Sequence, residues 1–316
     1  MTQREKQKLK KFIKKNNINV LLVANHDWCA LGEHYARSLR SIGVNATMFI
    51  RSRHRFNYPD QGTEFETDSQ IIPHVKDARI IHFMHSQYSL PNISLVNKKV
   101  VVSHTGSAYR NKHARLNNVF NPIVNLSIVG SSLYGKGAKN EHWIPGGVAD
   151  INLLQPIYER SSDKIIIAHF PSSPGLKGSK IIKSVFKTIR GNYEFNCSFE
   201  VINWKDNIER IKKCDVYVER FTQNTGFGIS AIEAAALGKI VITTYAFEQK
   251  YKETIGEFGL ISVKTQQELK EEIERIISLP DDKLLELKKK NREWAVKYHS
   301  YEAVGNRLLG LYRTIL

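Results

Sequence analysis

Short apolar segments alternate with amphipathic helical segments along the 316-residue chain, and this alternation constrains the fold more than any other feature. Residues 18–25 (INVLLVAN) are mostly apolar and predict a buried strand, whereas residues 31–43 (LGEHYARSLRSIG) predict a helix that ends at Gly43. Continuous apolar strands separated by helices are typical of a parallel sheet with helices on both faces. We therefore predict a doubly wound α/β architecture.

The strand–helix cycle stops once and then restarts. Residues 146–163 (GGVADINLLQPIYERSSD) are rich in Gly, Pro, Ser and Asp, a composition typical of a linker. Beyond them the sequence predicts strands that include 199–203 (FEVIN) and 215–220 (DVYVER), and long helices follow from Gln266. The predicted parts are two Rossmann-like domains, residues 1–150 and 151–297, and a terminal segment, residues 298–316.

The positive charge of the chain is concentrated in its first half. The formal net charge is +16, and residues 1–150 hold 21 Lys and Arg against 10 Asp and Glu. Such a surface attracts a phosphorylated substrate, acidic lipid headgroups or nucleic acid, although a solvated lysine-rich surface explains the same numbers. Within residues 6–15, Leu9, Phe12 and Ile13 share one helix side, which suits either membrane docking or packing on the first domain.

Cysteine usage and hydropathy favour a cytoplasmic protein, or one that is peripheral on the inner face of the membrane. The three cysteines, Cys29, Cys197 and Cys214, are far apart and form no CxxC pair, so we expect neither a disulfide framework nor a zinc site. No apolar run approaches the roughly 20 residues that cross a bilayer, and no secretory signal is recognisable at the N-terminus.

The stretch NTGFGISAIEAAALGK, residues 224–239, follows a predicted strand at the sheet edge where ligands bind in such folds. Gly226 and Gly228 let the backbone approach a ligand, and the helix after them offers N–H groups suited to phosphate. Glu233 borders the buried face of that helix, where hydroxyls of a sugar or ribose would supply hydrogen-bond donors. A glycine-rich turn with a glutamate on the helix flank remains the purely structural alternative.

Several segments together resemble a known family. Residues 226–244 (GFGISAIEAAALGKIVITT) resemble the signature helix of GT-B glycosyltransferases, specifically the retaining family 4 (glycosyltransferase group 1) type. Residues 165–185 (IIIAHFPSSPGLKGSKIIKSV) resemble the first strand and helix of the donor domain, with its Lys-Gly pair. Residues 142–156 (HWIPGGVADINLLQP) are similar to the hinge. In the first domain, VVVSHTGSAYR and LGEHYARSLRSIG resemble the acceptor-side strand end and helix.

The resemblance implies two Rossmann-like domains facing across a cleft, with the terminal helix of residues 298–316 returning to the first domain. It also implies a retaining, hexosyltransferase-type reaction. The donor would be a nucleotide sugar such as a UDP- or GDP-sugar, with no metal and no cofactor. The resemblance assigns catalysis to His104, facing the transferred sugar, and Lys177, neutralising the diphosphate. It assigns donor binding to Gly32, Ser172, Thr225, Gly226, Phe227, Gly228, Ile229 and Glu233, and acceptor or phosphate contacts to Ser107 and Arg110. The acceptor would be a cell-envelope glycan precursor or a protein, consistent with polysaccharide biosynthesis, and an anionic or membrane-borne acceptor suits the basic first half.

The chain departs from the family pattern at the first motif glutamate, which Thr225 replaces. A hydroxyl then stands where sugar hydroxyls are usually bound by a carboxylate, and Glu219 and Asn224 are nearby substitutes. This departure leaves open a catalytically silent GT-B module that binds a nucleotide sugar or a partner protein. Nucleic-acid binding through the basic half is a weaker third alternative, because basic and aromatic residues do not interleave.

Other positions also differ from the family or carry weaker signals. The usual arginine partner of the lysine is not evident, and the sequence offers His169 or Ser172 as alternatives near that position. Leu31 replaces one glycine of the first-domain pair, and Gly147 and Ala149 alter the hinge. His104 and Lys177, each taken alone, would be ordinary strand-end and loop residues.

Metal binding and other nucleotide motifs are disfavoured. His82 and His85 are spaced so that they point to opposite sides of a strand, which argues against a shared metal ion. The sequence contains no DxD triplet, no GxxxxGK[ST] phosphate loop and no GxGxxG fingerprint.

Overall fold

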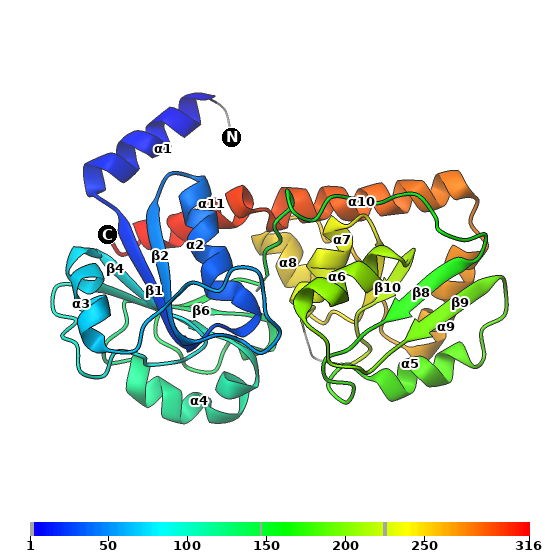
Figure 1. Ribbon diagram of the computed structural model, residues 1–316, viewed down its shortest axis with the longest axis horizontal. Coiled ribbons are helices and arrows are strands. Elements are labelled where there is room, and N and C mark those ends of the chain that lie inside the picture. The colour runs from blue at the N-terminus through cyan, green and yellow to red at the C-terminus, as the bar shows by residue number, and fades with distance from the viewer. Residues whose placement is uncertain (1–2, 146, 224–225) are drawn as a thin grey trace. The chain divides into compact units, whose positions relative to one another are not determined.

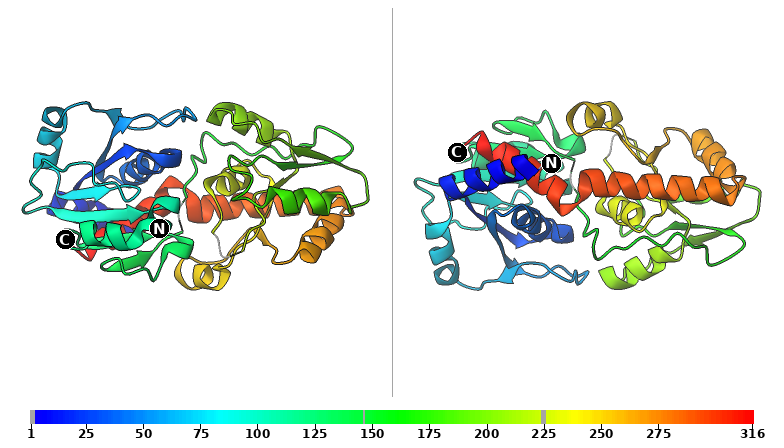
Figure 2. Two further views of the ribbon diagram at one scale, coloured as in Figure 1. Left: turned by 90° about the horizontal axis from the view of Figure 1, so that it is seen from below. Right: turned by 90° about the horizontal axis from the view of Figure 1, so that it is seen from above.

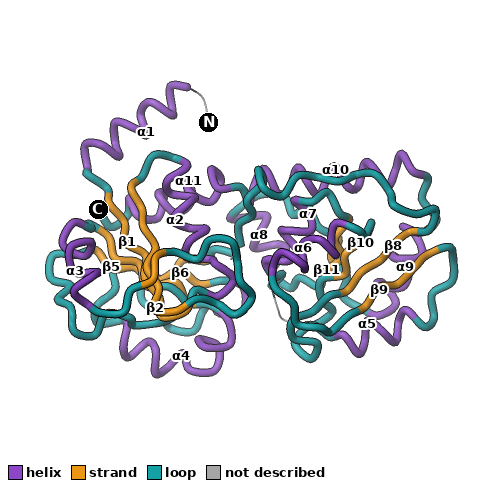
Figure 3. Tube along the Cα trace, viewed as in Figure 1, coloured by secondary structure: helices purple, strands orange, loops and turns teal. Residues whose placement is uncertain are grey.

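The computed structural model describes residues 3–145, 147–223 and 226–316, and the chain divides into two compact units. Unit 1 comprises Met1–Val148 and Tyr301–Leu316, and unit 2 comprises Ala149–Ser300. Each unit has a parallel sheet with helices around it, as the colouring by secondary structure shows (Figure 3). The predicted doubly wound α/β fold class is therefore confirmed.

The sheet of unit 1 has the strand order β3-β2-β1-β4-β5-β6-β7, and every pairing is parallel. Its order reverses between β1 and β4, and the carboxyl ends at such a reversal form the usual ligand site of the fold class. The strands are β1 (Asn19–His26), β2 (Asn45–Ser52), β3 (Thr63–Glu64), β4 (Ile80–Phe83), β5 (Lys99–His104), β6 (Leu126–Val129) and β7 (Glu141–Trp143).

The helices of unit 1 follow its strands in sequence, except for one at each end of the chain. At the two ends, the guanidinium of Arg313 lies 4.4 Å over the ring of Phe12, and α1 overlaps α11 in the view from above (Figure 2). The helices and short 3-10 turns are α1 (Gln3–Asn16), η1 (Trp28–Ala30), α2 (Leu31–Ser41), α3 (Asp68–Asp77), α4 (Gly106–Phe120), η2 (Ser131–Leu133) and α11 (Tyr301–Arg313).

The sheet of unit 2 has the order β12-β11-β10-β8-β9, again with parallel pairings, and its order reverses between β8 and β10. The loops after β8 and β10 therefore meet at the ligand-binding edge of this sheet. The strands are β8 (Ile165–His169), β9 (Tyr193–Cys197), β10 (Val216–Val218), β11 (Ile240–Thr243) and β12 (Ile261–Ser262). The helices are α5 (Ser179–Phe186), α6 (Trp204–Lys212), α7 (Ile229–Ala236), α8 (Glu248–Thr254), α9 (Gln266–Ile277) and α10 (Asp281–His299).

Buried aliphatic strands form the core of each unit. In unit 1, Val20, Leu22 and Val23 of β1 have no exposed surface, because helices cover both faces of the central strand. In unit 2, Ile167 and Val218 of the two strands at the switch point are equally buried. The strand ends at both switch points are therefore held by a fully packed core.

The C-terminal helix α11 belongs to unit 1 and packs on α2, which confirms the predicted return to the first domain (Figure 1). The helices approach closely at Gly305, where an added Cβ would lie 2.1 Å from the carbonyl oxygen of Ser38. The longest helix, α10, has 19 residues and is rich in charge. Within the residues that the structure describes, no helix combines the length and apolarity needed to cross a membrane.

The predicted strand at 199–203 is wrong, and the structure gives a physical reason. The edge strand β9 instead spans Tyr193–Cys197, where Tyr193 pairs with Ile165 of β8. Asn203 is the N-cap of α6, since its side-chain oxygen accepts the Asp206 N–H at 2.9 Å. The apolar residues before it thus lie in a loop that leads into a capped helix.

Two glycines of α11 should respond oppositely to substitution by alanine. We expect Gly305→Ala to lower the free energy of unfolding by about 1–3 kcal/mol, because its methyl group would collide with the α2 backbone. Gly310→Ala should raise it by up to about 1 kcal/mol, because position 310 is exposed and open and alanine favours helix. Urea unfolding followed by circular dichroism measures both, and changes of the same sign would contradict this packing.

Candidate functional site

The loops after β8 and β10 are joined at the switch point of unit 2. The backbone N–H of Phe221 donates to the carbonyl of Lys177 at 2.9 Å. Gly178 has φ +69°, and a Cβ there would lie 1.9 Å from the carbonyl oxygen of Phe221. Only glycine allows this approach, so the Lys-Gly pair has a structural reason that the sequence alone did not reveal.

A buried carboxylate lies between these two loops. Glu219 is 1% exposed and forms ion pairs with Lys177 and with Arg220, whose Nε lies 2.8 Å from Glu219 Oε2. The Thr243 hydroxyl also donates to Glu219 Oε2 at 3.0 Å. Burial would raise the pKa of Glu219, but the two cations outweigh it and lower the pKa to about 2. The carboxylate is therefore ionised at neutral pH and fixes both cations.

Arg220 lies beside Lys177, where the sequence suggested His169 or Ser172. His169 is fully buried, and its ring nitrogens lie 2.7 Å from the Val218 carbonyl oxygen and 2.7 Å from the Ser179 hydroxyl. Its imidazole is thus occupied within the fold, and burial lowers its pKa to about 4. Ser172 lies exposed in the loop after β8. The arginine beside Lys177 comes instead from the end of β10.

The glycine turn before α7, Gly226 to Gly228, lies beside the same two cations, Lys177 and Arg220. The Gly228 N–H donates to Glu219 Oε1 at 3.2 Å. A Cβ on Gly228 would lie 2.9 Å from Lys177 Nζ, 2.9 Å from Glu219 Oε1 and 3.5 Å from Arg220 Nη2. The absence of a side chain therefore brings the backbone up to two positive groups at the start of an eight-residue helix. This combination suits a phosphate group.

The other predicted residues of this turn have different environments. Gly226 and Ile229 are half-buried beside Gly228, whereas the Phe227 side chain is 8% exposed and packs in an aromatic cluster with Tyr245 and Trp294. Phe227 therefore anchors the turn, and only its backbone is available to a ligand. Thr225, like the alternative Asn224, lies outside the described residues.

Glu233 lies on α7 with 5% of its surface exposed, and Trp204 donates its indole N–H to Glu233 Oε1 at 2.6 Å. Burial raises the pKa of Glu233 to about 7, although the Trp204 hydrogen bond opposes the shift. Near neutral pH this carboxyl is thus close to half protonated. Trp204, which donates this hydrogen bond, is the first residue of α6. The sequence did not indicate that it would contact Glu233.

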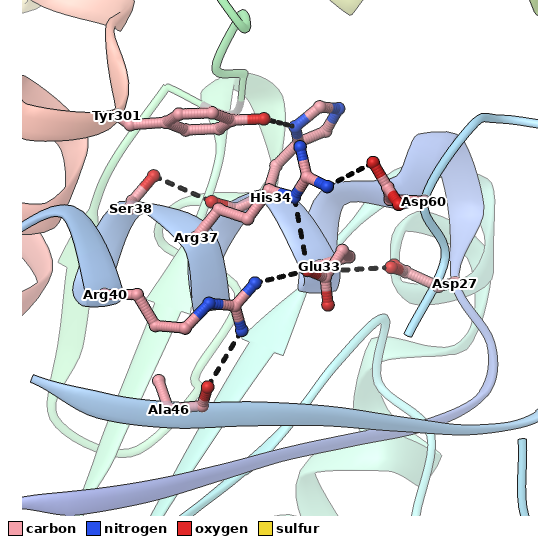
Figure 4. Close-up of polar contacts among 9 residues, drawn as sticks. All are labelled: Asp27, Glu33, His34, Arg37, Ser38, Arg40, Ala46, Asp60 and Tyr301. Carbon is pink, nitrogen blue, oxygen red and sulfur yellow. Dashed lines mark hydrogen bonds and ion pairs between the residues drawn. The ribbon is translucent and has the colours of Figure 1, made fainter. Parts of the chain in front are cut away.

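In unit 1, the predicted donor residue Gly32 lies at the start of α2, where the carboxylate of Asp27 occupies its amide. Figure 4 draws the neighbouring contact of Asp27 with Glu33. Asp27 is fully buried and accepts hydrogen bonds from the N–H groups of Gly32 at 2.8 Å and Glu33 at 2.9 Å. A Cβ on Gly32 would lie 2.6 Å from Met48 Cε. A side chain at position 32 would thus have to displace the end of the Met48 side chain, and Asp27 already stabilises this helix terminus.

Asp27 also connects two neighbouring strand ends of unit 1. Its Oδ1 lies 2.8 Å from His85 Nε2, and His85 Nδ1 lies 2.7 Å from the hydroxyl of Thr105. Because the carboxylate accepts hydrogen bonds, Nε2 donates to Asp27. His85 and Ser86 both have φ 59°, a left-handed conformation that is costly for residues other than glycine. His82, by contrast, contacts Tyr312 and Ser103 inside the core.

His104 lies at the end of β5 with 1% exposure, and its ring stacks on Tyr109 at 4.0 Å. Its Nδ1 lies 2.9 Å from the Ser86 hydroxyl, while no group of the described residues hydrogen-bonds to its Nε2. Burial lowers its pKa to about 4, so the ring is neutral near pH 7. An unsatisfied buried nitrogen at a strand end is a group that a ligand hydroxyl could satisfy.

The remaining predicted contacts lie on α4. Arg110 is exposed there, and Ser107 is in the first turn, with its side chain outside the described part of the chain. Among residues 3–145, 147–223 and 226–316, no three His, Cys, Asp or Glu side chains are grouped as a metal site would require.

Comparison with known proteins connects this geometry to a family. Residues 184–294, which include α7 and its glycine turn, match the family described as Glycosyl transferases group 1. No curated protein matches the chain. Over residues 184–294, which hold Glu219, Arg220 and Glu233, the resemblance to glycosyltransferase group 1 is confirmed.

Solved structures share the two-unit fold at low sequence identity. HepE of Anabaena in complex with UDP-glucose has a TM-score of 0.67 and 13% identity, covering 94% of this chain and 100% of that chain. Sucrose-phosphate synthase of Thermosynechococcus elongatus has a TM-score of 0.61 and 14% identity, covering 94% and 99%. WaaG, a glycosyltransferase involved in lipopolysaccharide biosynthesis, has a TM-score of 0.52 and 11% identity, covering 91% and 98%. The fold is that of the GT-B glycosyltransferases.

The raised pKa of Glu233 predicts a pH-dependent stability. The unfolded carboxyl ionises near its ordinary value, so the folded state holds an extra proton between about pH 4.5 and pH 7. Relative to Glu233→Gln, the wild-type free energy of unfolding should fall by on the order of 3 kcal/mol as the pH rises through this window, and then level off.

Urea unfolding at pH 5, 6, 7 and 8 measures this difference. Glu209→Gln is the matched control, because the Glu209 side chain is 53% exposed and should give a nearly constant difference. A constant difference for Glu233→Gln as well would show that its carboxyl is not buried in this way.

Proposed function

We propose that the protein transfers a glycosyl group from a nucleotide sugar to an acceptor hydroxyl, without a metal ion and with retention of anomeric configuration. The observation that carries the proposal is the convergence of Lys177 and Arg220 on the side-chain-free backbone of Gly228. Two cations and a helix N-terminus can stabilise a diphosphate leaving group electrostatically, a task that a metal ion performs elsewhere. The match of residues 184–294 to Glycosyl transferases group 1 supports the same activity.

The proposed donor is a UDP-sugar. HepE, which shares the fold, has been crystallised with UDP and with UDP-glucose, and this makes uridine nucleotides the first candidates. The diphosphate would contact Lys177, Arg220 and the backbone around Gly228, and the ribose hydroxyls would donate to Glu233. Ligand hydroxyls would then add to, or replace, the single indole N–H that this carboxylate has from Trp204.

In the proposed reaction, the acceptor oxygen forms a bond to the anomeric carbon as the bond from that carbon to the donor phosphate breaks. The nucleoside diphosphate leaves with the bonding electrons, and the proton of the acceptor hydroxyl moves to a phosphate oxygen of the leaving group. Attack and departure on the same face of the sugar give retention. Lys177 and Arg220 would stabilise the charge that grows on the diphosphate.

The catalytically silent module remains the rival, and Glu219 bears on it. The rival gains strength if no carboxylate lies near the position that Thr225 occupies in the sequence. Glu219 is a carboxylate close to the described part of this turn, since its Oε1 accepts the Gly228 N–H. This observation favours the transferase.

The proposed acceptor is a glycan, a lipid-linked precursor or a protein. We propose an anionic or membrane-borne acceptor because unit 1 carries most of the excess positive charge.

Thermal shift in the presence of EDTA tests donor binding. We expect UDP and UDP-glucose to raise the unfolding temperature more than adenosine and guanosine counterparts do, because a ligand of the folded state stabilises it. Lys177→Met and Arg220→Met should each weaken binding by about tenfold or more, since each removes a charged hydrogen bond. Lys187→Met and Arg190→Met are matched controls, because both residues are exposed on unit 2 away from the glycine turn.

Activity and stereochemistry complete this test. Product formation from the preferred donor in EDTA, followed by proton NMR of the new linkage, should show the donor's anomeric configuration. Nucleotide binding without any transfer would favour the silent module. Loss of binding in Lys187→Met and Arg190→Met as well would show that Lys177 and Arg220 contribute no more to nucleotide binding than other cations of unit 2.

Donor affinity should also depend on pH through Glu233. Its carboxylate must be ionised to accept two ribose hydroxyls, whereas burial raises the pKa of the free protein's carboxyl to about 7. Affinity for UDP-glucose should therefore increase by up to about tenfold per pH unit below pH 7 and level off above it. UDP-glucose is the suitable probe because its diphosphate does not titrate near neutrality. Calorimetric titration from pH 5.5 to 8.5 measures the dependence, and Glu233→Gln should abolish it.

A further inference from the structure

Trp28 is a large aromatic residue on the surface of unit 1 that the function proposed above leaves without a role. Its side chain follows β1 at the switch point and is 51% exposed, whereas Trp143 and Trp294 are buried and Trp204 is half-buried. Exposure of half a tryptophan at the ligand-binding edge of a sheet is costly in water and is typical of a binding surface.

The backbone that presents Trp28 is strained and firmly held. Cys29 and Ala30, the next two residues, have φ 58° and 52°, in the left-handed region that residues with a Cβ avoid. On the other side of Trp28, the buried Asp27 fixes the loop through its hydrogen bonds to α2, one of which is drawn in Figure 4, and to His85. A packed, strained turn that holds an aromatic ring outward indicates a position required by function rather than by folding.

A second loop, residues 53–61, supports the indole from the end of β2. The His54 ring lies 5.0 Å from the Trp28 ring in an edge-on arrangement, and Phe56 packs edge-on against His54 at 4.7 Å. Gln61 is buried, accepts the His54 backbone N–H and donates to the Tyr58 carbonyl at 3.2 Å. This loop is therefore ordered by its own contacts.

A salt bridge also ties the second loop to the helix that follows the first. Arg37 of α2 pairs with Asp60, and both are drawn in Figure 4. Because Asp27 holds the start of α2 and Asp60 holds Arg37 on the same helix, the two loops are fixed relative to one another. The aromatic surface is thus formed before any ligand arrives, which reduces the entropy lost on binding.

Polar and positive groups surround the apolar indole. Arg53 and Arg55 are exposed on the second loop; Arg53 pairs with Glu64, and Arg55 lies 5.2 Å over the Phe56 ring. His26 is exposed at the end of β1, with its ring 6.4 Å from the ring of Trp28. A flat apolar face with a rim of hydrogen-bond donors and cations matches a pyranose ring, which has an apolar C–H face, a rim of hydroxyls and, in acidic sugars, an anionic group.

This surface is continuous with the strand ends already described. The strands β2, β1, β4 and β5 are neighbours in the sheet, and their carboxyl ends carry His54, Trp28, His85 and His104 in that order. Asp27 precedes Trp28 directly and bonds His85, and Ser86 bonds His104. A saccharide that lies along this edge from Trp28 could reach the unsatisfied Nε2 of His104.

We propose that Trp28, with His54 and the arginines of the 53–55 loop, forms a binding site for an anionic saccharide whose pyranose ring stacks on the indole. The assignment of this saccharide as the acceptor rests on the proposed glycosyltransferase function. The binding itself does not, because all of its residues belong to unit 1.

Calorimetric titration of the full-length protein with oligosaccharides that carry uronate, sulfate or phosphate groups tests the site. Each acidic probe is paired with a neutral oligosaccharide of the same backbone. We expect an acidic probe to bind more tightly than its neutral counterpart. Trp28→Ala should weaken it by about tenfold, and Trp28→Phe should weaken it less, because phenylalanine keeps a smaller stacking face.

Charge variants separate specific from general attraction. Arg55→Glu should weaken the acidic probe by about tenfold, whereas Arg4→Glu, the same charge change on exposed α1, should leave its affinity within about twofold. Equal effects of the two variants would overturn the site, as would unchanged binding in Trp28→Ala. Binding of no acidic probe, or equal binding of the neutral ones, would also overturn it.

Stabilisation by UDP provides the independent readout. Trp28→Ala should keep the wild-type thermal shift with UDP, because the donor groups are in unit 2. If UDP stabilises neither protein, the proposed transferase function fails, while the oligosaccharide titration still decides whether Trp28 binds a saccharide.

Discussion

The ionised carboxylate of Glu219 is the interaction on which the arrangement of the unit 2 site depends. A buried charge without partners is very costly, and here two cations, a hydroxyl and a backbone N–H compensate it. Without the carboxylate, Lys177 and Arg220 would repel each other, and the glycine turn would lose its acceptor. One residue that solvent does not reach therefore determines where both positive groups and the start of α7 lie.

Unit 1 uses the same physical device at its own switch point. Asp27 is also fully buried and also ends a central strand, and it binds two helix amides and one imidazole. In each unit an acidic residue at the strand end converts flexible loops into a fixed surface. The difference lies in the partners, because Glu219 binds Lys177 and Arg220, whereas Asp27 binds two backbone amides and an imidazole beside the exposed Trp28. The chemistry offered to a ligand differs accordingly.

The alternation of strands and helices and the glycine turn could be predicted from the sequence, because both are local patterns. The roles of Trp204 and Asp27 could not, since their partners depend on tertiary packing over 29 and 58 residues of separation. Arg220 was detectable in principle, because Glu219 and Arg220 end an otherwise apolar strand with adjacent opposite charges. The strand expected at 199–203 failed because apolar content alone does not separate an edge strand from a loop, and the cap at Asn203 determined the outcome.

The close approach of Gly178 to Phe221 has a consequence for how such a site can diversify. The backbones after β8 and β10 touch where any side chain at 178 would collide with the Phe221 carbonyl. An insertion or a larger residue in one loop must therefore displace the other. During evolution a change in one loop therefore requires a compensating change in the other. Selection acts on the two loops together, although some forty residues separate them in the chain.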